Sequence, residues 1–135
     1  MRKWITTLML TLTAHLTSWA DPRSPFESEL ARLAGRAAQQ CGLVSLHRAF
    51  AKGWQCAVEA DRSGQPFWFA VQGQGEDSEV WSAAIRTPSG EHVVLDYDSN
   101  VAGGRGLNPH FSRTSCPASI EYLPTEVPPF RCKRV

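Results

Sequence analysis

The chain has 135 residues, and its 14 Lys and Arg residues nearly balance its 13 Asp and Glu residues. This near-neutral charge, without a basic stripe, argues against a nucleic-acid-binding protein and against a polybasic membrane anchor. After the first twenty residues, no apolar run reaches the roughly 18 residues that a transmembrane helix needs, so we expect no membrane insertion of the rest of the chain.

Residues 1–20 have the pattern of a secretory signal peptide. Arg2 and Lys3 give a positive start, Ile5–Leu12 is mostly apolar, and Ser18-Trp19-Ala20 places small residues before a cleavage site. The apolar stretch is too short and too rich in threonine to span a bilayer. The sequence therefore predicts a signal peptide that is removed on export.

The remaining residues 21–135 are the length of one domain, and we expect a single α+β domain in an oxidising compartment, periplasmic or secreted. Four cysteines remain in it, at positions Cys41, Cys56, Cys116 and Cys132. Three pairings are possible, and the spacing favours Cys41–Cys56 and Cys116–Cys132. Each bond would close a loop of about 15 residues, worth roughly 3 kcal/mol. A zinc site is the competing interpretation, but it would require closely spaced Cys-x-x-Cys pairs.

The first predicted element is a helix over residues 25–41. Ser24 can cap it, Pro25 suits the first helical position, and Glu27 completes a capping box. Apolar residues from Phe26 onward then recur at helical spacing, and Gly42 can end the helix.

After this helix the apolar residues alternate, which predicts strands. They are expected at residues 43–50, 54–60, 66–72, 80–87 and 91–97, with two short strands in the tail at 120–123 and 130–133. The order of elements predicts an α+β fold, in which one N-terminal amphipathic helix packs on an antiparallel sheet of about five to seven strands with two disulfides.

The clearest hairpin flanks Pro88-Ser89-Gly90. Pro suits the first corner of a type I turn, and Gly90 can take the left-handed position that a three-residue loop needs. If Thr87 faces Glu91, the register joins apolar residues on one face, and the pairs are Trp81 with Tyr97, Ala83 with Leu95 and Ile85 with Val93.

A candidate binding surface follows from the expected faces of the sheet. A Cys41–Cys56 bond would turn Cys56 toward the helix, and alternation along the strands then leaves Trp68, Arg86 and His92 on the outer face. An outward Trp beside an Arg is typical of a protein-binding hot spot. Alternatively, Trp68 lies under the long loop or the tail and completes a second small core.

Residues 98–117 lose periodicity and are rich in glycine, so we expect a long loop that is anchored by Cys116. His110 lies in this loop near Ser112 and Ser115, and it is a second candidate binding residue. The same residues suggest a small hydrolase with His110 as base, although no orienting partner and no Gly-x-Ser-x-Gly elbow accompany them.

A calcium loop is weakly suggested by the alternating oxygen ligands Asp96, Asp98 and Asn100. The pattern then fails, because Val101 replaces the required Gly and Leu107 replaces the bidentate Glu. We therefore predict no metal, no cofactor and no catalytic set.

The sequence favours a small exported, non-enzymatic binding protein whose partner is another exported protein. Its general make-up resembles that of periplasmic inhibitors and immunity proteins, without a shared motif. The binding residues would be Trp68, Arg86 and His92 on the sheet, or His110 in the loop over residues 98–117. The two alternatives are the small secreted hydrolase and an accessory subunit of an envelope assembly.

Overall fold

The computed structural model describes residues 24–45, 50–104 and 108–135. The predicted signal peptide over residues 1–20 lies outside this part of the chain. The described residues have mixed α+β content with a five-stranded sheet, a two-stranded sheet and two disulfides, as the sequence predicted in outline.

Two helices and seven strands follow one another along the described chain. They are α1 (Pro25–Ala34), β1 (Gln39–Val44), α2 (Phe50–Arg62), β2 (Phe67–Gln72), β3 (Val80–Arg86), β4 (His92–Asp98), β5 (His110–Cys116), β6 (Ile120–Tyr122) and β7 (Phe130–Cys132). The large sheet has the order β1-β2-β3-β4-β5 and the small one pairs β6 with β7. β1 runs parallel to β2, and every other pair is antiparallel.

The central hairpin of β3 and β4 has the predicted register. The three apolar pairs are those expected, namely Trp81 with Tyr97, Ala83 with Leu95 and Ile85 with Val93. The amide of Thr87 donates to the carbonyl oxygen of Glu91 at 2.9 Å, which closes the turn. The prediction succeeded because a tight turn fixes the register of the strands it joins.

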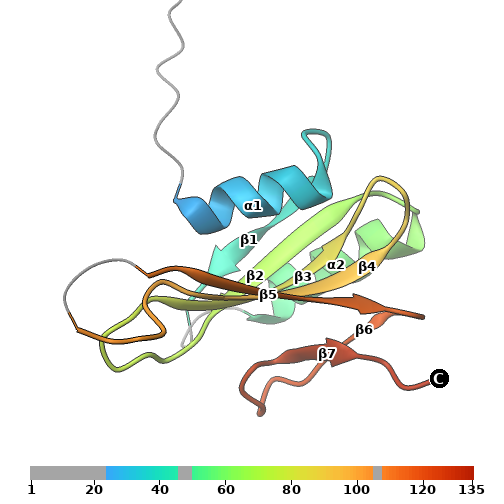
Figure 1. Ribbon diagram of the computed structural model, residues 1–135. Helices are drawn as coiled ribbons and strands as arrows, with labels where there is room; N and C mark the ends of the chain where they lie inside the picture. Colours follow the sequence, from blue (N-terminus) through green and yellow to red (C-terminus); the bar gives the residue numbers. More distant parts are fainter. Residues whose placement is uncertain (1–23, 46–49, 105–107) are drawn as a thin grey trace, which may run out of the picture.

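Both faces of the large sheet are covered (Figure 1). α1 packs on one face, where Phe26 and Leu30 contact the apolar side chains of β3 and β4. α2 and the β6–β7 pair cover the other face, where Ala57 and Phe130 join Phe69 in a second core. The two cores explain why the centres of β2, β3 and β4 carry consecutive apolar residues instead of alternating with polar ones.

α1 begins as predicted and ends earlier. The amide of Glu27 donates to Ser24 Oγ at 3.2 Å, and the amide of Ser24 donates to the Glu27 carboxylate at 3.1 Å, which completes the capping box. The helix ends at Ala34 because Gly35 adopts φ 82°, a left-handed backbone that no helix can continue. The predicted end at residue 41 was therefore wrong, and Cys41 lies in β1.

The predicted strand over residues 54–60 is also wrong, since this segment is part of α2. Its buried residues are the small Gly53, Ala57 and Ala60, at helical spacings of four and three. The alternation of larger residues hid this small-residue face. Because a helix joins β1 to β2, the chain returns in the same direction, and the expected purely antiparallel sheet is a mixed one.

The two disulfides are the pairs that the spacing favoured. Cys41–Cys56 joins β1 to α2, and Cys116–Cys132 joins β5 to β7. Two disulfides within one small chain suggest an oxidising environment outside the cytosol. None of the helices in the described residues has the length and apolar character to cross a membrane.

Gly53 allows α2 to approach the sheet closely, and this contact gives a first prediction. A methyl group added at Gly53 would lie 2.2 Å from Phe69 Cε2, a carbon of a fully buried ring. We expect Gly53→Ala to lower the free energy of unfolding by about 1–3 kcal/mol through overpacking, although alanine is the better helix former by about 1 kcal/mol.

Lys52→Ala is the matched control, because Lys52 is exposed on the same helix. Urea unfolding of both variants measures the difference. A Gly53→Ala protein as stable as the parent would show that α2 does not pack on Phe69 at this distance.

Candidate functional site

The predicted outer-face cluster of Trp68, Arg86 and His92 does not exist as one surface. Trp68 pairs with Ile85, whereas Arg86 pairs with Phe67, so Trp68 and Arg86 lie on opposite faces of the sheet. Trp68 is half-buried in the core beneath α1. The alternative of a second core is therefore correct, with α1 as its cover in place of the loop or the tail.

This error has a single cause, which is the incorrect strand over residues 54–60. With Cys56 placed on a strand, its disulfide appeared to orient the whole sheet toward one helix. In the structure Cys56 lies on α2, on the face opposite to α1. The disulfide therefore reports the position of α2 and carries no information about which face α1 covers.

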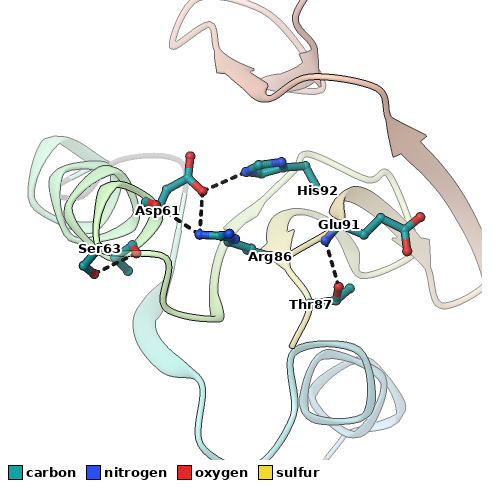
Figure 2. Close-up of polar contacts among 7 residues, drawn as sticks. Asp61, Ser63, Arg86, Thr87, Glu91 and His92 are labelled. Atoms are coloured by element: carbon teal, nitrogen blue, oxygen red, sulfur yellow. Dashed lines mark hydrogen bonds and ion pairs between the residues drawn. The ribbon is translucent and has the colours of Figure 1, made fainter. Parts of the chain in front are cut away.

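Arg86 and His92 do meet, around Asp61, an aspartate that the sequence pattern did not single out (Figure 2). His92 Nε2 lies 2.7 Å from Asp61 Oδ1. Arg86 Nη1 donates to the carbonyl oxygen of Asp61 at 3.1 Å and lies 3.6 Å from its Oδ1. Asp61 reaches both side chains because it stands in the last turn of α2, so only the helical assignment of this segment could have revealed the cluster.

The hydroxyl groups near this cluster are turned toward the backbone (Figure 2). Ser63 Oγ donates to the carbonyl oxygen of Ala60 at 2.9 Å, and Thr87 Oγ1 accepts the amide of Glu91 at 3.1 Å. Within the described residues, His92 has no hydroxyl as a hydrogen-bond partner, and each of the four cysteines is in a disulfide. An acyl-transfer nucleophile would be hydrogen-bonded to the histidine, and no described hydroxyl or thiol has this contact with His92.

His110 is a strand residue, and its predicted place in a loop was wrong. It is the exposed first residue of β5, opposite Asp98 in the ladder with β4. The predicted loop over residues 98–117 was therefore wrong for its second half, and its residues 105–107 lie outside the described part. The serines that accompany His110 in sequence belong to the same strand, which explains their alternation with Phe111 and Arg113.

Asp96 and Asp98, which belong to the weak calcium pattern, each accept a hydrogen bond from another group of the chain. Asp98 Oδ1 accepts the amide of Asn100 at 2.8 Å, a turn within the chain. Asp96 Oδ1 accepts the Ser82 hydroxyl at 2.7 Å across the β3–β4 ladder. The described residues contain no group of three or more potential metal ligands.

The carboxyl group of Asp96 is perturbed by its position in the ladder. Burial raises the pKa of Asp96 above its ordinary value of 3.8, and the hydrogen bond from Ser82 offsets part of this rise. The native state therefore holds a proton on Asp96 more readily than the unfolded chain does. This contribution to stability is fully present below pH 3.8 and is lost as the pH rises through the native pKa.

Asp96→Asn tests this assignment. An amide oxygen can still accept the Ser82 hydroxyl but carries no charge to desolvate, so the variant should have the higher melting temperature at pH 7. The difference should shrink as the pH falls toward 3.8. Calorimetry between pH 3 and pH 8 measures it, and a variant less stable than the parent at pH 7 would contradict the desolvation of this carboxylate.

The outer edge of β5 is the second candidate site. β5 is the last strand of the large sheet, and no strand of the described chain pairs with its far side (Figure 1). Its pairing with β4 is regular over seven residue pairs, without a bulge. A regular strand with one unpaired side presents a row of backbone donors and acceptors.

The hydrogen bonds of the neighbouring ladder identify which groups of β5 point outward. Thr87 and Ser99 donate their amides to Glu91 and Glu79, which places odd-numbered residues of β4 toward β3. The even-numbered residues of β4 therefore bond to the even-numbered residues of β5. The amides and carbonyls of Phe111, Arg113 and Ser115 are left pointing away from the sheet.

The opposite edge of the sheet is irregular by comparison. β1 has a shift of register between Gln40 and Leu43, and Gly42 within it adopts φ 113°. Cys41 also ties β1 to α2 through its disulfide. Bulges of this kind disturb strand pairing and protect an edge. β5 has neither a bulge nor a proline.

The side chain of Arg113 forms an ion pair with α1. Arg113 Nη2 lies 2.5 Å from Glu29 Oε1, on α1. The hydrogen bond from Arg32 lowers the pKa of Glu29, and the bond from Arg113 adds to this effect. Glu29 thus stays ionised and links α1 to β5. The exposed side chains that remain on the strand are His110, Ser112, Thr114 and Ser115.

No family model matches this chain, and searches of curated proteins and of solved structures returned no match either.

Proposed function

We propose that the mature chain is an exported, non-enzymatic binding protein that engages another exported protein through the outer edge of β5. The observation that carries this proposal is the regular, unbulged strand whose amides and carbonyls at Phe111, Arg113 and Ser115 point away from the sheet. These groups are complementary to an extended segment of another chain, which would add a strand to the sheet. The edge includes His110, which the sequence analysis had selected.

The chemistry of the described side chains favours binding over catalysis. Among the described residues, His92 is the histidine with a carboxylate partner, and none of the described nucleophilic side chains is hydrogen-bonded to it. His110 stands exposed at the end of the edge, where it can contact a bound segment. An inhibitor or immunity protein would use such an edge to hold a loop or a terminal strand of its target.

The disulfides support an exported location for this encounter, which we place in the periplasm or outside the cell. The Cys116–Cys132 bond lies at one end of the proposed surface, and the Cys41–Cys56 bond joins β1 to α2, which covers one face of the sheet. Cys116, the last residue of β5, is bonded to Cys132 in β7, so the far end of the edge is fixed to the rest of the domain.

Proline at position 113 tests the proposal. The amide of Arg113 points outward, so Arg113→Pro removes a donor for a partner strand without removing a bond to β4. Arg113→Ala is the matched control, because it loses the same exposed ion pair with Glu29, worth about 0–1 kcal/mol, and keeps the amide. In a pull-down from an envelope extract of the producing organism, we expect the proline variant to capture at least about tenfold less partner than the alanine variant.

Ser115→Pro serves as a second variant at an outward amide, should the first one fail to fold, and melting curves of each variant check the fold. Equal capture by the proline and alanine variants would contradict binding at this edge. Assay of the captured protein with and without the mature chain then separates an inhibitor from an accessory subunit, because only the inhibitor changes the activity of its partner.

A further inference from the structure

A cavity of about 280 Å³ lies between α2, the start of β4 and the chain around β6 and the C-terminus. Its lining includes the apolar side chains of Trp54, Phe67 and Ile120. The Trp54 ring is held in place by two neighbouring rings, with its centroid 5.2 Å from that of Tyr122 and 5.9 Å from that of Phe130.

The lining of the cavity also carries the cationic side chains of Arg62 and Lys133. Arg62, His92 and Lys133 line it, and Asp61 is the one acidic residue among its lining residues. Asp61 already has two cationic or hydrogen-bonding neighbours, His92 at 2.7 Å and Arg86 at 3.6 Å. Neither Arg62 nor Lys133 forms an ion pair with any residue of the described segments.

At the end of α2, the carbonyl oxygens of Ala60 and Asp61 already accept hydrogen bonds, which lowers the negative potential there. The amides of Gln65 and Gly64 donate to the carbonyls of Ala60 and Asp61 at 2.9 and 3.0 Å. Arg86 Nη1 donates to the Asp61 carbonyl as well. These bonds compensate part of the partial charge that a helix C-terminus presents. The lining of the cavity thus combines apolar residues with two cations, Arg62 and Lys133, that form no ion pair with a described residue.

We propose that this cavity binds a carboxylate carried on an aromatic or aliphatic group. The apolar part of the ligand would lie against Trp54, Phe67 and Ile120, and its carboxylate would meet Arg62 and Lys133 at the rim. The volume of about 280 Å³ lies just below the range of about 300–1,000 Å³ typical of ligand sites, and it suits one ring with a short acidic chain. The ligand is either a free carboxylic acid or the C-terminal aromatic residue of a polypeptide, and this site does not depend on the edge of β5.

The probes are 3-phenylpropionate and its neutral analogue 3-phenylpropanamide, titrated into the mature oxidised protein by NMR. We expect the acid to bind with a dissociation constant on the order of 1 mM and the amide to bind at least about tenfold more weakly. Arg62→Gln and Lys133→Gln should each weaken the acid by about fivefold or more, since each removes a charge-assisted contact.

Lys52→Gln is the charge-matched control. Lys52 is exposed in the first turn of α2 and is absent from the cavity lining, so this variant should bind the acid like the parent. Equal binding of acid and amide, no binding of either, or an equal loss in Lys52→Gln would each overturn the proposal. These measurements need no partner protein, so their failure is distinguishable from a failure of binding at β5.

Acetyl-Gly-Phe with a free carboxylate, compared with its C-terminal amide, separates the two sources of ligand. Tighter binding of the dipeptide acid than of 3-phenylpropionate assigns the cavity to a chain terminus, and the reverse order assigns it to a free acid. Either order supports carboxylate recognition, provided that the amidated dipeptide binds at least about tenfold more weakly than the free acid.

Discussion

The central strands β2, β3 and β4 carry apolar side chains on both faces, so the sheet is stable only while two separate layers cover it. α1 supplies one layer through Phe26 and Leu30, and α2 with the β6–β7 pair supplies the other. The two disulfides fix the second layer, because one joins α2 to β1 and the other joins β7 to β5. With both faces occupied, the surfaces left for other molecules are the edges of the sheet and the rims of its covering layers.

Local signals in the sequence were sufficient where neighbouring residues determine the structure. The capping box at Ser24 and Glu27 predicted where α1 begins, and the turn at Pro88-Ser89-Gly90 predicted the register of β3 and β4. The cysteine spacing predicted the two disulfides for a related reason, since each bond spans a short stretch of chain. Each of these features depends on residues that are close in sequence.

Features that depend on distant packing could not be predicted in the same way. α2 was mistaken for a strand because its buried residues are Gly53, Ala57 and Ala60, whose small side chains give no hydrophobic periodicity. At Gly53 the small size is dictated by the Phe69 ring of β2. This one error reversed the face assigned to Trp68, and it hid the contact of Asp61 with Arg86 and His92. The position of His110 on an edge strand was lost because polar edge strands lack the apolar alternation that marks a strand.

β5 is an open edge of the sheet, and amide hydrogen exchange of the oxidised protein measures that property directly. The amides of Ser112 and Thr114 point toward β4, whereas those of Phe111, Arg113 and Ser115 point outward. We expect slow exchange for the first pair and exchange faster by about tenfold or more for the outward three, in strict alternation along the strand. Slow exchange at all five positions would show that something covers this edge, and it would contradict the proposed binding surface.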